Sequence, residues 1–203
     1  MNLLIDGLPE EVEIAGQTVR ISTGFRTGIL FEEVLQDHSL DDADKLQTAL
    51  ELYFPGVVFD YEVLPEAVNR LIWFYRCGSD PTETKDTDEA GSGEDPPYSY
   101  EHDADYIYAA FRQAYGIDLA RDTLHWWQFR ALFRSLPEDT QMVKIIGYRT
   151  MKIPASATTE QRQHYEKMKR IYALPEDADR LQLESDLNTL LMNGGDPSAL
   201  LRQ

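Results

Sequence analysis

The side chains that could carry catalysis or bind a metal are scattered along the 203-residue chain. The four histidines stand too far apart for any two to share one face of a helical turn; they are His38, His102, His125 and His164. The single cysteine, Cys77, has no cluster of positive charge beside it in the sequence to activate its thiol. Because no nucleophile, base and orienting group can be assembled from these spacings, we expect no enzymatic activity and no cofactor.

Three short patterns suggest chemistry but have simpler explanations. The acidic stretch Glu101–Asp105 includes one histidine, yet zinc takes three or four ligands, and carboxylates in a first helical turn are favoured by the helix dipole. His125 precedes two tryptophans, and a histidine there more often makes a hydrogen bond at a helix start than acts in catalysis. Gly24 and Gly28 form no phosphate-binding fingerprint. We therefore expect no metal site and a helix-start hydrogen bond at His125.

Charge and composition limit the classes of partner. The formal net charge of −17 at pH 7 repels nucleic acid and anionic lipid, so we expect neither a nucleic-acid nor a membrane partner. A lone cysteine cannot form an internal disulfide, which is typical of a reducing compartment. The N-terminus has neither the basic region nor the apolar core of a signal peptide, and the apolar runs are too short to span a membrane. The sequence predicts a soluble intracellular protein.

The N-terminal third combines a hairpin with helices. Residues 11–14 and 18–22 alternate polar and apolar side chains around a turn containing Gly16, which predicts a β-hairpin packed on the helices that follow. Beyond it the period becomes helical, with Leu30 and Leu35 expected on a buried face and Glu32 on the opposite one. Further helices are predicted over 42–54, capped by an aspartate, and over 66–77, opened by a proline and ended by a glycine.

The rest of the chain predicts a mainly α, single-domain fold, with the hairpin packed against a bundle of about seven or eight helices. Asp122 or Thr123 should cap the helix that carries the tryptophans, Gly147 should interrupt the next one, and Thr158 or Thr159 should cap the one after it. By composition the chain divides into the N-terminal hairpin (1–22), a first helical part (23–78), an acidic loop (79–97), an aromatic-rich helical part (98–174), and a C-terminal helix and tail (175–203).

The acidic loop carries seven carboxylates against one lysine and no large apolar side chain. Such a segment cannot bury enough surface to offset its ordering entropy, so it is predicted to be a disordered linker. An alternative is a lure for a basic partner or a mimic of DNA, although a mimic should hold its carboxylates on a rigid scaffold.

The aromatic run between Tyr98 and Lys152 has two interpretations. Aromatic residues at helical spacing usually pack in a core, but they can also line a groove for a partner helix. Trp126 and Trp127 point about 100° apart on a helix, so one of them is expected at a margin or an interface. The candidate partner-binding residues are Tyr108, Trp126, Trp127, Phe129, Phe133, Tyr148 and the leucines of the C-terminal helix, Leu183, Leu187, Leu190 and Leu191.

Several strings carry a family resemblance. They are LIWFYRCG at 71–78, YSYEHDADYIYAAFRQAYGIDL at 98–119, LHWWQFRALFRSLPEDTQMVKIIGYRTMKI at 124–153 and HYEKMKRIYALP at 164–175. HWW and IIGYR, in that order, are the most specific. The chain resembles the Gp-fifteen-like family of small phage proteins, which are encoded in the tail gene cluster of long-tailed phages and prophages of Gram-positive bacteria.

The resemblance implies a role in tail morphogenesis. It predicts a tail assembly chaperone that binds the tape-measure protein or other tail proteins in the bacterial host cytoplasm and is absent from the mature virion, with homo-oligomerisation possible. A strongly acidic, helix-rich protein could keep a helical client with apolar stripes in solution. The alternatives are a structural tail component, such as a completion or ring protein, and an acidic inhibitor of a host nucleic-acid-binding protein.

Overall fold

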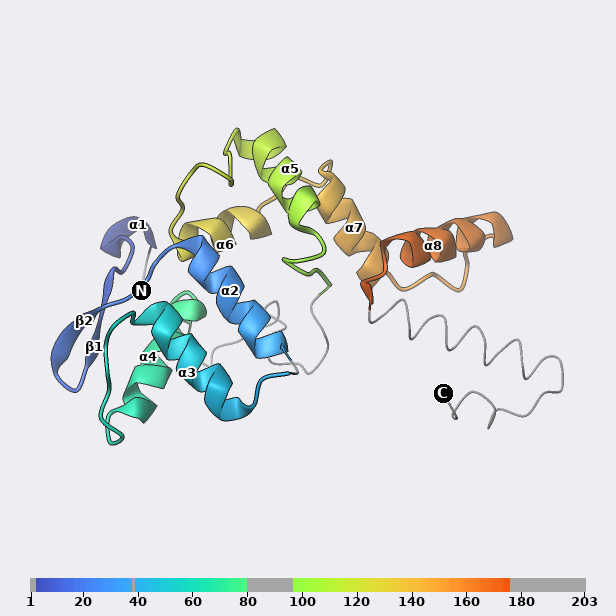
Figure 1. Ribbon diagram of the computed structural model, residues 1–203. Helices are drawn as coiled ribbons and strands as arrows, with labels where there is room; N and C mark the ends of the chain where they lie inside the picture. The colour runs from blue at the N-terminus through green and yellow to red at the C-terminus, as the bar shows by residue number, and fades with distance from the viewer. Residues whose placement is uncertain (1–2, 38, 80–96, 176–203) are drawn as a thin grey trace, which may run out of the picture. The chain divides into compact units, whose positions relative to one another are not determined.

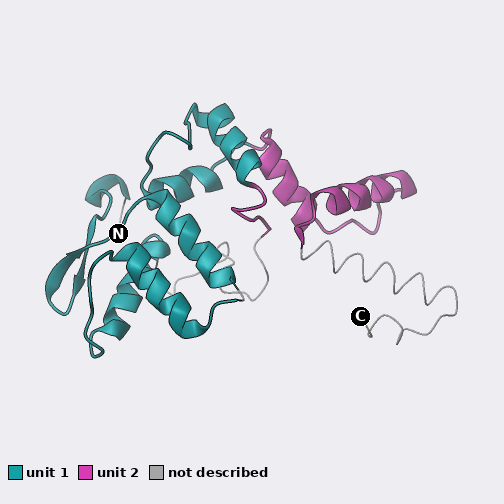
Figure 2. Cartoon of the chain, in the orientation of Figure 1, with its two compact units in different colours: residues 1–96, 104–137 teal, residues 97–103, 138–203 magenta. Residues whose placement is uncertain are grey.

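The structure is a computed structural model that describes residues 3–37, 39–79 and 97–175. Over these residues the chain is mainly α, with eight helices and a two-stranded antiparallel hairpin near the N-terminus (Figure 1). The predicted fold class is confirmed. The chain divides into two compact units, which are coloured separately in Figure 2. Unit 1 comprises residues 1–96 and 104–137, and unit 2 comprises residues 97–103 and 138–203.

The hairpin pairs β1 (Glu11–Ile14) with β2 (Gln17–Arg20), and it follows a short helix, α1 (Leu3–Asp6), that the sequence did not predict. Gly16 takes a positive φ of 72° in the turn, as expected. The hairpin packs on α4 (Leu64–Tyr75): the Ala15 N–H donates to the Glu66 carboxylate at 3.1 Å, and Arg70 Nε donates to the Glu13 carbonyl at 2.9 Å. The prediction that the hairpin packs on helices is confirmed.

Unit 1 contains four more helices, and local signals in the sequence explain where two of the helices of this unit begin. Asp41 accepts from the Asp44 N–H at 2.8 Å, and Pro65 occupies the first turn of α4, so both predicted start signals are confirmed. The four helices are α2 (Phe25–Gln36), α3 (Asp42–Tyr53), α5 (Ala104–Tyr115) and α6 (Trp126–Arg134).

The predicted buried face of α2 is wrong. Leu30 and Leu35 are exposed, whereas Glu32 is buried, together with Phe25, Gly28 and Phe31. Gly28 lies against the Trp126 ring, with no room for a Cβ, and the phenylalanines contact aromatic rings of α6 and α3. Glu32 is accommodated because the Tyr75 hydroxyl donates to its carboxylate at 2.8 Å.

Helices α2 and α6 begin side by side, although 101 residues separate their paired starts, Gly24 and His125. The Phe25 N–H donates to the Leu124 carbonyl at 2.9 Å, and the Trp126 N–H donates to the Thr23 carbonyl at 2.7 Å. This short antiparallel bridge fixes the register of the two helices at their first turns.

Unit 2 is built from the segment 97–103, α7 (Gln141–Thr150) and α8 (Thr159–Tyr172). Thr158 caps α8 by accepting from the Gln161 N–H at 3.2 Å, as predicted. Gly147 was expected to interrupt α7, but the helix continues through it to Thr150. A glycine in a helix interior costs only about 1 kcal/mol, which tertiary contacts can outweigh.

Candidate partner-binding surface

His125 is the side-chain cap of α6. The Trp127 N–H donates to His125 Nδ1 at 3.1 Å, and the His125 N–H donates to Gln128 Oε1 at 3.2 Å, which completes a capping box. Since Nδ1 accepts, the proton sits on Nε2, which donates to the Pro9 carbonyl at 3.0 Å. Burial lowers the pKa of His125, against the opposing effects of the Pro9 carbonyl and the Glu10 charge. The predicted hydrogen bond is confirmed, and Asp122 or Thr123 as the cap is wrong.

The two tryptophans that follow close the C-terminal end of α4. Trp126 Nε1 donates to the Tyr75 carbonyl at 2.8 Å, and Trp127 Nε1 donates to the Phe74 carbonyl at 2.7 Å. Carbonyls in the last turn of a helix lack the usual intrahelical partner. The Trp126 indole supplies a donor for the Tyr75 carbonyl, and the Trp127 indole supplies a further donor for the Phe74 carbonyl, which also accepts from the Cys77 N–H.

The backbone after α4 completes this closure. Cys77 adopts a positive φ of 56°, which allows the Gly78 N–H to reach the Trp73 carbonyl at 2.9 Å. The Cys77 N–H donates to the Phe74 carbonyl at 3.0 Å. A side chain on Gly78 would lie 3.0 Å from the Trp127 ring. The positions of α4 and α6 are therefore fixed by side-chain and backbone hydrogen bonds together.

The expectation that one tryptophan lies at a margin is wrong, because both are buried, as are Phe129 and Phe133. Trp126 lies against α2 and the end of α4, and Trp127 is covered by α4 as well. Phe129 stacks on Phe25 with 5.0 Å between ring centroids. These four predicted partner-binding side chains are core residues of unit 1, and they offer no open groove to a partner.

A buried polar cluster lies beside this core. Burial raises the pKa of the Glu32 carboxyl, opposed by the hydrogen bond from Tyr75 and by the charge of Arg130. The Arg130 guanidinium lies 5.4 Å from the centroid of the Trp126 ring. Burial also raises the pKa of the Tyr53 hydroxyl, which has no hydrogen-bond partner among the described residues. The cluster is enclosed by aromatic rings, so we assign it a structural role.

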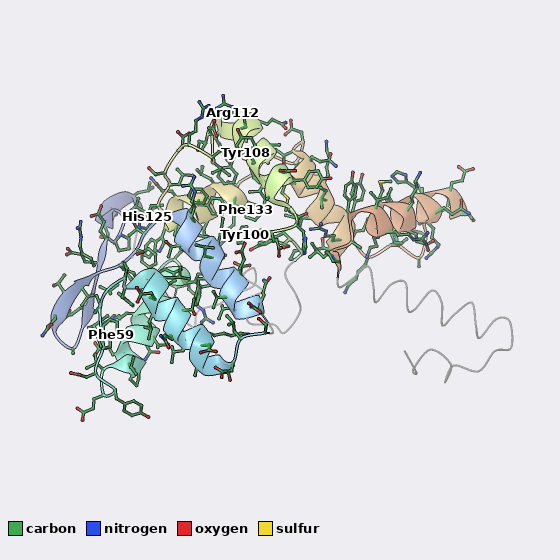
Figure 3. All side chains as sticks on the ribbon, in the orientation of Figure 1. Phe59, Tyr100, Tyr108, Arg112, His125 and Phe133 are labelled. Carbon is green, nitrogen blue, oxygen red and sulfur yellow. The ribbon has the colours of Figure 1, made fainter. Side chains whose placement is uncertain are left out.

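The other predicted partner-binding residues have different surroundings. Tyr108 is partly exposed on α5, where its hydroxyl donates to Asp118 Oδ1 at 3.3 Å (Figure 3). Tyr148 of unit 2 stacks on Tyr172 at 5.8 Å between centroids. The remaining four candidates, Leu183, Leu187, Leu190 and Leu191, lie outside the described residues.

Sequence reasoning missed the role of Arg149 in unit 2. Its guanidinium forms a bidentate ion pair with the Asp103 carboxylate, with 2.6 Å between Nη1 and Oδ2 and 2.8 Å between Nη2 and Oδ1. Both side chains are nearly buried. Nη1 also donates to the Pro97 carbonyl at 3.0 Å, and Nε donates to the Tyr172 carbonyl at 2.5 Å. Asp103 belongs to the acidic stretch considered above for a metal, and here its carboxylate accepts from Arg149, whose guanidinium joins the segment 97–103, α7 and the end of α8.

Within the described residues, no group of three or more His, Cys, Asp or Glu side chains is placed to hold a metal ion. None of the helices in the described ranges has the length and hydropathy needed to cross a membrane.

Helices α2 and α3 run antiparallel, and contacts at both ends fix their register. The Phe31 and Tyr53 rings meet edge to face, with 5.4 Å between centroids. Nearer the connecting loop, Lys45 Nζ donates to the Leu35 carbonyl at 2.9 Å. These contacts place residues 31–35 of α2 alongside residues 45–53 of α3, and Figure 1 shows the two helices side by side.

Apolar side chains remain partly exposed on these two helices. Leu30 keeps 47% of its surface exposed and Leu46 keeps 39%, while their neighbours Val34 and Leu50 are half-buried. We call these four residues, Leu30, Val34, Leu46 and Leu50, the α2–α3 seam. The helical periodicity of the sequence placed all four on core-facing positions. The sequence therefore did not predict that they would be partly exposed.

Carboxylates also lie on the same two helices and their caps. The exposed ones are Glu33, Asp37, Asp41, Asp42, Asp44 and Glu51. The outer side of α3 also borders an open hollow of about 510 Å³, lined by Leu40, Asp44, Gln47, Thr48, Glu51 and Leu52.

Residues 4–174 match the family described as bacteriophage Gp15 protein, which covers most of the 203-residue chain. No curated protein and no solved structure matches the chain significantly. The HWW string, which caps α6 and closes α4, and the IIGYR string, which carries Arg149, both lie inside the matched range. The chain belongs to the bacteriophage Gp15 protein family.

Proposed function

We propose that this phage protein is a tail assembly chaperone that binds the tape-measure protein in the cytoplasm of the bacterial host and leaves before the virion is complete. The observation that carries the proposal is the α2–α3 seam, a set of partly exposed apolar side chains on two packed helices that also carry exposed carboxylates, in a chain of net charge −17. Membership of the bacteriophage Gp15 protein family supports the phage context.

The chemistry of the seam defines the client segment. A tape-measure protein is a long helical chain whose apolar stripes would aggregate if exposed. An apolar strip on two packed helices can take one such stripe by helix-in-groove docking, and the surrounding carboxylates favour clients with lysine or arginine beside it. The net charge of the chaperone then keeps the complex in solution.

The test is co-expression with the tape-measure protein of the same phage, followed by affinity capture and size-exclusion chromatography. The variant Leu30→Lys/Leu46→Lys adds positive charge to the seam and preserves helix propensity, and we expect it to reduce client capture at least about tenfold. The control is Val58→Lys, at a residue 95% exposed on the loop between α3 and α4. It should capture the client normally.

Thermal melts of each variant separate loss of binding from loss of fold. Equal capture by the double variant and the wild type, with unchanged melting, would exclude the seam as the client site. Mass spectrometry of purified virions tests the wider proposal. Stoichiometric presence of the protein in mature particles would instead support a structural tail component.

A further inference from the structure

Helix α8 is amphipathic but has no buried residue. Its inner side meets α7 through the ring of Tyr172, which stacks on Tyr148, and through the bond from Arg149 to the Tyr172 carbonyl. On the outer side, Lys167 and Arg170 are exposed, and Ile171 keeps 55% of its surface exposed. This outer side therefore combines basic and apolar groups without being covered by another described element.

The part of unit 2 that contains α8 has a net charge of opposite sign to that of the whole chain. Residues 138–175 carry seven lysines and arginines against four acidic residues, a net charge of +3, whereas the whole chain carries −17. A basic helix in so acidic a chain attracts carboxylates and, because the rest of the chain repels phosphate backbones, favours an acidic protein segment over nucleic acid.

The residues that follow α8 have the complementary composition. The segment 176–203 has six acidic residues against two arginines, and it has leucines at helical spacing, Leu183, Leu187, Leu190 and Leu191. It begins four residues after α8 ends at Tyr172. A short connection of this kind joins antiparallel neighbours, and it keeps the effective concentration of the segment in the millimolar range or above, on the order of what short linkers give.

We propose that the outer side of α8 is the docking surface for the segment 176–203 of the same chain. In an antiparallel arrangement the first carboxylates of the segment, Asp177 and Asp179, come next to Lys167 and Arg170, near the C-terminal end of α8. The family match ends at residue 174, so the occupant is an extension beyond the part of the chain that the family shares.

The proposal is independent of the function proposed above, and it is tested on the full chain by charge reversal and rescue. Amide hydrogen exchange is measured over residues 163–171. In Lys167→Glu/Arg170→Glu we expect exchange there to speed up about tenfold, because several charge pairs are lost together. Adding Asp177→Lys/Asp179→Lys to that variant should restore protection. The matched control is Lys144→Glu/Lys152→Glu, which reverses two exposed charges of unit 2 outside α8 and should leave exchange unchanged.

A chain ending at Pro175 provides the second measurement, with circular dichroism to check that its helices remain. Faster exchange over residues 163–171 in this variant supports docking, and unchanged exchange overturns it. Light scattering shows whether the segment that covers α8 comes from the same chain or from a second copy. If protection appears only at concentrations where dimers form, the segment comes from a second copy, and docking within one chain is overturned.

Discussion

At the residue scale, His125 acts through its neutral imidazole. Nδ1 can accept from the Trp127 N–H only while it is unprotonated, and the same ring donates to the Pro9 carbonyl. Protonation would leave two positive N–H groups facing each other at the start of α6. The cap is therefore tied to the charge state of one ring.

This dependence predicts loss of stability in mild acid. Because burial lowers the pKa of His125 below 6.5, the unfolded chain binds the proton more readily, and the contribution of His125 is complete above about pH 6.5 and is lost as pH falls through the folded-state pKa. His125→Asn keeps a capping side chain and removes the titration. Urea unfolding at about pH 7.5 and 5.5 should show a smaller loss in this variant than in the wild type. Equal losses in both proteins would contradict the assignment.

Gly28 is a second residue whose role is set by a single neighbour. A Cβ built on it would lie 2.3 Å from the Trp126 ring, so Gly28→Ala should destabilise unit 1 by about 1–3 kcal/mol, despite the better helix propensity of alanine. Gly147→Ala is the matched control, because nothing lies within 4 Å of that position in α7, and it should gain up to about 1 kcal/mol. Urea denaturation measures both, and a stabilised Gly28→Ala would show that α2 and α6 are not so close.

At the element scale, unit 2 depends on the ion pair between Arg149 of α7 and Asp103. Arg149→Met leaves the Asp103 carboxylate buried without its partner, which should cost about 3–5 kcal/mol. Asp103→Leu/Arg149→Met removes both charges and should recover much of that loss. Lys144→Met, on an exposed position of the same helix, is the control and should change little. Thermal unfolding followed by circular dichroism makes the comparison, and a loss from the double variant as large as from Arg149→Met would contradict this account.

Local signals in the sequence were enough to locate most helices, but they did not determine which side of a helix is buried. Asp41, Pro65 and Thr158 act within one turn, so their positions predict helix starts directly. The buried face of α2 depends on Trp126 and Tyr75, which are distant in sequence, and hydrophobicity alone placed Leu30 inside and Glu32 outside. For the same reason the sequence did not predict that the aromatic helix suggested for a groove is enclosed by α2 and α4.

At the scale of the whole molecule, the negative charge of the chain should attract a basic client over a long range. Salt screens charges at the protein surface beyond about 10 Å at 0.1 M ionic strength. We therefore expect capture of a basic client to weaken as sodium chloride rises from about 0.05 to 0.5 M, mainly through a slower association rate. Surface plasmon resonance at several salt concentrations would measure this. If the affinity did not change with salt, the charges would not contribute to it, and the client would be recognised through the apolar seam alone.

The bridge between Gly24 and His125 and the two indole hydrogen bonds also determine how late in translation the packing of the N-terminal half can be completed. The carbonyls at the end of α4 receive their indole donors from residues that are made 51 and 53 positions later. At about 5–20 residues per second, a ribosome needs roughly 3–10 seconds to reach them. During that interval the nascent N-terminal half lacks Trp126 and Trp127, so the apolar side chains that they cover in the finished protein stay open to water and to other chains.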